Sequence, residues 1–419
     1  MLRLAYTLLW HLALPLLPLR LWWRGRKEPG YREAIGERFG RYGARPAGPI
    51  LWIHAVSLGE TRAAQPLVRA LRERYPDHTL LLTHMTATGR EAARSLYGEF
   101  AQLAFLPYDL PWAVRRFVAH FRPQLGVIME TEIWPNLVRA CREADVPVLL
   151  ANARLSPKSA RGYASVGSLT RQALADLAAI GAQTQADAAR LGELGARGVE
   201  VTGNLKFDAT PPMETETRAQ ALRTLFGDRS VFLAASTREG EEPVLLDALA
   251  RNPPPPGTLT VIVPRHPQRF DEVAGMLSNR GHAFVRRSEA RPVPPECGFV
   301  LGDSMGEMSA YYASCDIAFV GGSLLPFGAQ NLIEACAVGA PVLIGPSTFN
   351  FAEAAAEAVR RGAAVQVADA DALVREAARL LSDAGARAWM GEAGEAFCAA
   401  HRGATARTMT IVARLIAGR

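Results

Sequence analysis

The sequence has few cysteines and lacks the short motifs that mark several common catalytic centres. Its five cysteines include no C-x-x-C pair and lie mostly in apolar or helical contexts, which indicates reduced thiols and a cytosolic compartment. None of the eight histidines forms an H-x-x-x-H or comparable pair, so a zinc site is not expected. There is also no G-x-S-x-G elbow and no Walker A loop, which argues against the hydrolases and nucleotidases built on them.

The chain is also poor in patterns that bind a divalent cation. One D-x-D pair, Asp369 and Asp371, opens the helical run 372–381. Because Asp is a favoured N-cap residue, we interpret this pair as helix capping rather than as ligands for a metal-bound diphosphate. No metal and no separate cofactor is therefore expected.

Basic charge is too sparse for a typical nucleic-acid-binding protein. The formal net charge is +6 over 419 residues, and Lys and Arg are mostly interspersed with acids on predicted helix faces. Nucleic acid is therefore not an expected partner. The small positive excess favours an anionic ligand or an anionic surface.

No apolar run is long enough for a comfortable membrane span. Residues 4–19 are apolar apart from Thr7 and His11, and as a helix they would extend roughly 24 Å, short of a bilayer core. Bulky residues stand where a signal peptidase would need small ones, which argues against secretion. Pro15 and Pro18 would bend a straight helix, so an apolar helix packed on the protein itself is the alternative to an anchor.

Basic residues after this run orient the chain. Arg3 precedes it, whereas four basic residues follow it at once, namely Arg20, Arg24, Arg26 and Lys27. By the positive-inside rule, the rest of the chain lies on the cytoplasmic side. We expect residues 1–30 to form a membrane anchor, either spanning or interfacial, with Trp22 and Trp23 in the headgroup layer. Deletion of residues 1–23 should then weaken membrane association more than catalysis.

From about residue 50 the chain alternates short apolar runs with amphipathic helical runs, the pattern of α/β proteins. Its length predicts two domains, 31–208 and 209–419, with a Pro- and Thr-rich linker over 210–217. We expect two doubly wound Rossmann-like domains facing a cleft, with ligands beyond the carboxyl ends of the strands. The predicted strands are 50–56, 79–85, 103–106, 125–129, 146–150, 199–202, 231–235, 259–263, 299–301, 317–320, 341–344 and 364–367.

Three strand ends of the first domain carry polar residues suited to acid–base chemistry. Glu60, in HAVSLGE, lies at a strand-to-helix turn, where a buried carboxylate could act as a general base. Ser57 and Glu60 also have capping-box spacing, so they could simply cap the helix. Glu130 and Glu132 follow a later strand in METEIWPN. Arg154, after the next strand, could bind a phosphate or carboxylate, or form a surface salt bridge.

The second domain repeats this arrangement with groups suited to a phosphorylated donor. Arg265 follows a predicted strand and is a natural partner for phosphate, with a surface arginine as the alternative. Lys206, beside the linker, could reach across the cleft. The remaining candidates at these strand ends are Ser236, Thr237, Pro264, Met305, Gly306 and Glu307.

Residues 321–351 combine a glycine-rich loop, a short helix and a buried strand, a layout typical of a nucleotide-sugar pocket. Asn331 opens the helix, and Glu334 lies one turn later, where it could accept hydrogen bonds from ribose hydroxyls. The pair also has capping-box spacing, so mutual capping is the alternative. Because Arg265 and Glu307 follow neighbouring predicted strands, we favour the interpretation that Asn331 and Glu334 contact the nucleotide and also cap the helix.

Several of these segments occur together in one known family. They are HAVSLGE, THMTATG, METEIWPN, NARLS, GNLKFD, PRH, MGE, GGSLLPFGAQNLIEA and GPSTFNF. Each is weak alone, but in this order they extend across nearly the whole chain. On these segments the chain resembles the 3-deoxy-D-manno-octulosonic acid (Kdo) transferases, which add Kdo to lipid A precursors in lipopolysaccharide biosynthesis.

The resemblance implies a GT-B fold, CMP-β-Kdo as donor, lipid IVA as acceptor, inversion at the anomeric carbon, no required metal and a place at the cell inner membrane. It also implies that Glu60 is the proton acceptor and that Glu130 or Glu132 is a second essential carboxylate. The implied CMP contacts are Pro264, Arg265, Met305, Gly306, Glu307, Asn331, Leu332, Ile333 and Glu334.

Two other functions remain open from the sequence. A nucleotide-sugar 2-epimerase could share the two-domain fold, although it has no reason to carry an apolar anchor. A non-enzymatic, membrane-bound nucleotide-binding protein would bind CMP without needing Glu60. The sequence leaves open the number of Kdo residues transferred, the acyl preference for the acceptor and the oligomeric state.

Overall fold

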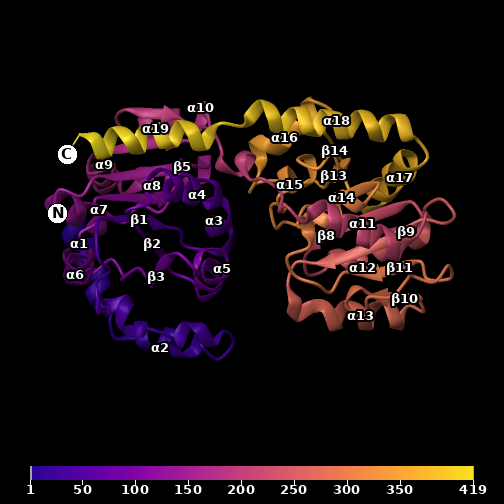
Figure 1. Ribbon diagram of the computed structural model, residues 1–419, viewed down its shortest axis with the longest axis horizontal. Helices are drawn as coiled ribbons and strands as arrows, with labels where there is room; N and C mark the ends of the chain where they lie inside the picture. The colour runs from indigo at the N-terminus through magenta and orange to yellow at the C-terminus, as the bar shows by residue number, and fades with distance from the viewer. Residues whose placement is uncertain (1, 419) are drawn as a thin grey trace. The chain divides into compact units, whose positions relative to one another are not determined.

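The structure, a computed structural model, describes residues 2–418 and divides the chain into two compact units. The first unit takes the chain up to Ala209 together with the stretch from His401 onward, and the second takes Thr210–Ala400. Each unit is built around one seven-stranded sheet in which every strand pair is parallel. Helices cover both sides of each sheet (Figure 1).

The first sheet has the order β3-β2-β1-β4-β5-β6-β7. Its strands are β1 Ile50–His54, β2 Thr79–His84, β3 Ala101–Phe105, β4 Leu125–Met129, β5 Val148–Ala153, β6 Ala179–Ala182 and β7 Val199–Val201. Its helices are α3 Leu58–Ala63, α4 Gln65–Arg74, α5 Ala87–Tyr97, α6 Pro111–Phe121, α7 Pro135–Glu143, α8 Pro157–Ser165, α9 Gly167–Ala175, α10 Gln185–Glu193 and α19 Ala404–Ala417.

The centre of this sheet shows why apolar runs became buried strands. Every residue of β1 and of β4 is buried, as expected for parallel strands covered on both faces. Trp52 of β1 lies against Gly126 of β4, where a Cβ atom would come within 2.6 Å of the indole ring. Glycine is therefore required at 126 to leave room for the tryptophan.

The second sheet has the order β10-β11-β9-β8-β12-β13-β14. Its strands are β8 Val231–Thr237, β9 Leu259–Pro264, β10 Phe284–Arg286, β11 Phe299–Leu301, β12 Ile317–Val320, β13 Val342–Ile344 and β14 Ala364–Gln366. Its helices are α11 Thr215–Phe226, α12 Glu241–Arg251, α13 Phe270–Asn279, α14 Met308–Ser314, α15 Leu332–Cys336, α16 Ala352–Arg360, α17 Ala370–Leu381 and α18 Ala384–His401.

All twelve predicted strands are present with small shifts at their ends, and two further strands, β6 and β10, were not predicted. The β6 segment reads AIGA and β10 reads FVR, so both are too short and too weakly apolar to stand out. The linker predicted over 210–217 is shorter in the structure, because α11 already begins at Thr215.

The last helix lies with the first unit, whereas the sequence placed residues 209–419 together. Ala404, Ile411 and Val412 of α19 are buried in the core of the first unit. The Asp208 carboxylate accepts hydrogen bonds from the backbone N–H groups of Gly403, at 2.7 Å, and Thr405, at 2.5 Å. The apolar stripe of α19 and this cap draw the chain back to the first unit.

The N-terminal segment forms two helices, α1 Leu2–Ala13 and α2 Leu16–Arg24, with a bend of 60° between them. Within residues 2–418 no single helix is long and apolar enough to cross a membrane, although this bent pair has the length and composition to do so. Leu17 and Leu21 of α2 are buried against Tyr31 and Tyr108. The segment therefore packs partly on the protein itself, as the alternative interpretation predicted.

Candidate functional site

Glu60 lies in the first turn of α3, directly beyond the end of β1. Its Oε2 accepts a hydrogen bond from the Val56 N–H at 2.8 Å, and its Oε1 accepts one from the Ser57 hydroxyl at 3.1 Å. Ser57 is the N-cap residue but makes no side-chain cap bond to the helix, so the reciprocal capping box is not formed. The carboxylate is thus oriented by two donors.

The surroundings of Glu60 make it a stronger base than an ordinary carboxylate. Burial, followed by the negative charge of Glu130 and then that of Glu132, raises the pKa of Glu60 to about 8. A base is most useful when its pKa lies near the working pH. Burial and neighbouring acids therefore give Glu60 the basicity that general-base catalysis requires.

Glu130 and Glu132 follow β4, the neighbour of β1 in the sheet. Glu130 adopts a left-handed backbone conformation, with φ of 58°, which is uncommon for a residue with a side chain. The Glu132 Oε2 accepts a hydrogen bond from the Trp134 Nε1–H at 2.9 Å, and burial raises the pKa of Glu132. The predicted acids are thus near enough to act on Glu60 electrostatically.

Lys206 lies in the first unit, and its Nζ is 3.6 Å from Glu130 Oε1. This ion pair differs from the predicted reach toward the other domain. Lys206 follows β7, and three strands, β5, β6 and β7, lie between it and Glu130 along the chain, so sequence spacing could not suggest the pair. Arg154 directly follows β5, the next strand along the sheet from β4, as predicted.

In the second unit, Ser236 and Thr237 end β8. Ser236 has a left-handed backbone with φ of 55°. Thr237 is fully buried, and its hydroxyl donates to Glu242 Oε1 at 2.7 Å. Glu242 also pairs with the Arg269 guanidinium at 2.6 Å. The structure therefore uses Thr237 in a buried polar network rather than as an exposed ligand contact.

Glu241 organises the glycine-rich loop after β12, and the sequence did not single it out. Its carboxylate is buried and accepts hydrogen bonds from the N–H groups of Arg238 at 2.8 Å, Gly322 at 2.6 Å and Leu324 at 3.0 Å. One side chain from α12 thus holds the turn after β8 together with the loop after β12. The sequence signal that could have found Glu241 is its position as the first of two acids that open α12.

The predicted nucleotide-binding residues lie around this loop. Arg265 Nε donates to Gln330 Oε1 at 3.1 Å, next to Asn331 in the chain. Asn331 caps α15 by accepting from the Ile333 N–H at 3.2 Å, and its amide donates to Glu334 Oε1 at 2.9 Å. The Asn331 side chain thus caps α15 and holds the Glu334 carboxylate in place.

The MGE segment lies between β11 and α14. Met305 is 54% exposed, Gly306 has φ of 78°, and Glu307 Oε1 accepts from Arg287 Nη2 at 3.1 Å. Tyr312, buried in α14, is close enough to Glu334 and Arg265 for both charges to act on its pKa, which burial raises. The structure thus brings α14, α15 and the end of β9 together.

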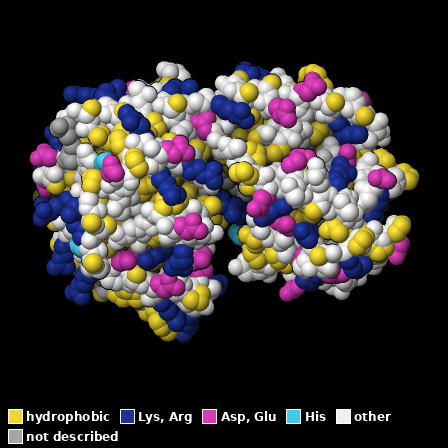
Figure 2. Space-filling model, viewed as in Figure 1, with side chains coloured by type: hydrophobic (Ala, Val, Ile, Leu, Met, Phe, Trp, Pro, Cys, Tyr) yellow, Lys and Arg dark blue, Asp and Glu magenta, His cyan; other side chains and the backbone are white. Residues whose placement is uncertain are grey.

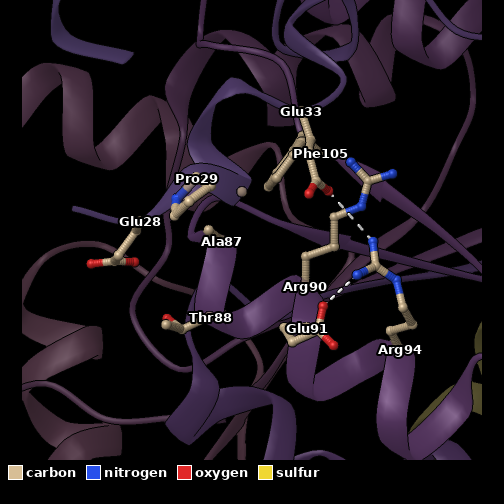
Figure 3. A pocket seen from close by; sticks show the side chains of 10 residues that line it. Glu28, Pro29, Glu33, Ala87, Thr88, Arg90, Glu91, Arg94 and Phe105 are labelled. Carbon is tan, nitrogen blue, oxygen red and sulfur yellow. Dashed lines mark hydrogen bonds and ion pairs between the residues drawn. The ribbon is translucent and has the colours of Figure 1, made fainter. Parts of the chain in front are cut away.

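A separate pocket in the first unit contains none of the predicted site residues. It lies between the segment after α2 and α5 and is lined by Glu28, Pro29, Gly30, Glu33, Ala87, Thr88, Arg90, Glu91, Arg94 and Phe105. Figure 3 shows Arg94 between Glu33 and Glu91, with which it forms ion pairs. Its charged groups are therefore largely used in pairs with one another.

Comparison with known proteins gives the family of the chain. A family model described as 3-deoxy-D-manno-octulosonic-acid transferase (kdotransferase) matches residues 33–209, and one for group 1 glycosyl transferases matches residues 260–397. The 3-deoxy-D-manno-octulosonic acid transferase of Bordetella pertussis is 46% identical over 97% of both chains. The chain belongs to the Kdo transferase family. It is accordingly a glycosyltransferase, confirming the resemblance drawn from its motifs.

Other comparisons support the same assignment. The Kdo transferase of Haemophilus influenzae is 36% identical over 98% of both chains. UDP-GlcNAc 2-epimerase from Neisseria meningitidis has a TM-score of 0.60 over 89% of this chain and 100% of that chain, at 15% identity. HepE from Anabaena has a TM-score of 0.58 over 88% and 99%, at 16% identity. These structural likenesses confirm a GT-B-like fold, and the epimerase alternative gains no functional support from them.

Proposed function

We propose that this Kdo transferase moves Kdo from CMP-β-Kdo to a lipid A precursor of the lipid IVA type, with inversion and without a metal. The reaction would contribute to the inner core of lipopolysaccharide. The observation that carries the proposal is Glu60, a partly buried carboxylate that Val56 and Ser57 orient and whose pKa is raised by burial and by nearby acids. Such a group suits removal of a proton from a sugar hydroxyl.

In the proposed reaction, ionised Glu60 takes the proton of an acceptor hydroxyl as its oxygen attacks the anomeric carbon of Kdo. The bond between that carbon and the phosphate oxygen breaks, and CMP leaves with the electron pair. Attack from the side opposite CMP inverts the configuration. Glu130 or Glu132 is the second carboxylate, and the charges of both support the basicity of Glu60.

We assign the donor to the second unit. Arg265 can offset charge on the leaving phosphate, and Glu334 can accept hydrogen bonds from ribose hydroxyls. Arg265 donates a hydrogen bond to Gln330, and Asn331, the next residue in the chain, donates one to Glu334. These two bonds hold Arg265 and Glu334 in position. The other proposed CMP contacts are Pro264, Met305, Gly306, Glu307, Leu332 and Ile333.

Replacing Glu241 with Ala is expected to lower the free energy of unfolding by about 1–3 kcal/mol, because buried N–H groups lose their acceptor. CMP binding should weaken at the same time, since Gly322 and Leu324 lose their anchor. Chemical denaturation and titration calorimetry with CMP measure the two effects. The control is Glu239→Ala, a neighbouring side chain that is 54% exposed and pairs with Arg238. Normal CMP binding by Glu241→Ala would contradict this organising role.

A chelator is expected to leave the transfer rate unchanged. The D-x-D residues are already used: Asp369 caps α17 through the Ala372 N–H at 2.8 Å, and Asp371 pairs with Arg251 at 2.9 Å. Initial rates with and without EDTA, followed by added magnesium, measure this. A large loss that magnesium restores would require a metal in the mechanism.

We propose that α1 and α2 lie in the membrane interface on the cytoplasmic side of the inner membrane. In Figure 2, hydrophobic side chains with neighbouring basic ones occupy the lower edge of the first unit, where Figure 1 places α2. Trp22 and Trp23 are 48% and 63% exposed, as suits the headgroup layer. The buried Leu17 and Leu21 favour an interfacial helix over a spanning one. Basic residues beside α2 would add roughly 1 kcal/mol each on an anionic surface.

Mass analysis of the product tests the proposed function. The full chain is incubated with lipid IVA and CMP-Kdo generated in place, and the expected product is lipid IVA enlarged by whole Kdo residues. Donor without acceptor is the control, since an epimerase would change the donor alone. Intact lipid IVA after incubation with the folded, CMP-binding protein would overturn the proposal.

A further inference from the structure

The anchor helix α1 has two chemically different faces. Tyr6, Thr7 and Trp10 share one face at helical spacing and are partly buried. The opposite face exposes four leucines, at 74%, 60%, 65% and 66%, which are Leu4, Leu8, Leu9 and Leu12. One face is thus available to a membrane, while the other packs on the enzyme.

The inner face of α1 reaches the loop that carries the acids. The Trp10 ring stacks on the Trp134 ring, with centroids 6.4 Å apart and planes 23° from parallel. One helical turn earlier, the Thr7 hydroxyl donates to Asn136 Oδ1 at 3.3 Å. Trp134 in turn donates its Nε1–H to Glu132 Oε2 at 2.9 Å. The stack of Trp10 on Trp134 and the hydrogen bond from Trp134 to Glu132 therefore connect α1 to an acid of the proposed site.

The far end of the same loop is held by Asp109. This buried carboxylate accepts from the N–H groups of Asn136 at 3.0 Å and Leu137 at 2.8 Å. The Asn136 amide donates to the Asp109 carbonyl at 2.7 Å. Tyr6 is also near enough to Asp109 for the two groups to interact electrostatically, which adds a further link from α1. The loop between β4 and α7 is therefore clamped at its end, and Trp134 is the side chain that links this clamp to Glu132.

We propose that Trp10 is a positioning residue for transfer: it holds Trp134 in the orientation that directs its N–H to Glu132. The inference rests on the proposed role of Glu130 and Glu132 beside Glu60. An aromatic stack of this kind favours one orientation of the Trp134 ring over the others. The helix that is proposed to meet the membrane therefore also packs against the loop that carries Glu132.

The test compares variants on the two faces of α1. Trp10→Ala in the full chain is expected to lower kcat about tenfold with lipid IVA dispersed in detergent micelles, with KM and liposome flotation changed less than about twofold. The matched control, Leu8→Ala with Leu12→Ala, is expected to show the reverse: weaker flotation and near-normal kcat in micelles. Trp10→Phe keeps an aromatic ring and should recover most of the loss.

A second variant keeps the test informative if Trp10→Ala folds poorly. Trp134→Phe retains a stacking ring and removes only the N–H that reaches Glu132, so it should lower kcat by a similar factor. Combining Trp10→Ala with Trp134→Phe should cost little more than either change alone, because both act through one contact.

Two results would overturn the inference. One is a normal kcat in micelles for folded Trp10→Ala with reduced flotation, which would make α1 only a tether. The other is a normal kcat for Trp134→Phe. Neither outcome bears on Glu60, whose replacement tests the proposed function separately, so the two failures are distinguishable.

Discussion

Glu60→Gln is expected to reduce kcat by about 10²–10⁴-fold, the range that general-base catalysis contributes. Gln has a similar shape: its carbonyl oxygen can still accept from the Val56 N–H, and its NH2 group can donate to the Ser57 hydroxyl oxygen. It cannot, however, take a proton from the acceptor hydroxyl. Turnover with lipid IVA and CMP-Kdo measures the loss. CMP binding should stay normal, since the proposed nucleotide contacts lie in the second unit.

The matched control for Glu60→Gln is Glu73→Gln, the same change at an exposed position of α4. It should leave kcat unchanged. Near-normal turnover by Glu60→Gln would remove Glu60 as the base and leave the proton acceptor to be sought among the neighbouring acids.

Thermal stability gives an internal check on the same variant. Because burial raises the pKa of Glu60 from 4.5 to about 8, the contribution of this group to stability is fully present at low pH and is lost as the pH rises through about 8. Gln does not ionise. The melting temperature of Glu60→Gln should therefore be no lower than that of the unmodified enzyme above about pH 8.

The pH dependence of kcat/KM should be the second large effect. The base must be ionised to accept a proton, so the rate is expected to rise about tenfold per pH unit at acid pH and level off above about pH 8. A profile that levels off near the ordinary carboxylate value would contradict the buried environment of Glu60. Initial rates over a pH series, with Tm confirming a folded enzyme at each point, measure the midpoint.

Glu130→Gln should move this midpoint downward. The charge of Glu130 is the second cause of the raised pKa of Glu60, after burial, so its removal makes ionisation of Glu60 easier. Initial rates of the variant over the same pH series measure the midpoint. An unchanged or higher midpoint would show that the charge of Glu130 does not act on Glu60.

Sequence patterns predicted most of this architecture because parallel strands have simple signatures. Apolar runs gave twelve of the fourteen strands found in residues 2–418, and polar residues at their carboxyl ends supplied the candidate site residues, since those ends share one edge of a sheet. Strands β6 and β10 lacked that signal. The capping role of Asp369 was predictable, since it depends on neighbours in the chain.

Contacts between distant residues could not be predicted in the same way. Lys206 and Glu130 pair although three strands separate them along the chain, and the hydroxyl of the buried Thr237 donates to Glu242. Helix α19 packs on the first unit because its apolar residues fit a surface of that unit that exists only after folding. No periodicity in the sequence encodes which partner a side chain will meet.

The sequence by itself determined the family, the alternation of strands and helices, and an apolar N-terminus of limited length. The tertiary structure decided that Glu60 is a partly buried carboxylate among acids, that Glu241 organises the loop of the second unit, and that α1 presents Trp10 to Trp134. Helical spacing predicts which residues share a face of a helix. The pKa values and ring stacking of those residues depend on which groups cover that face after folding, and the sequence pattern does not give those groups.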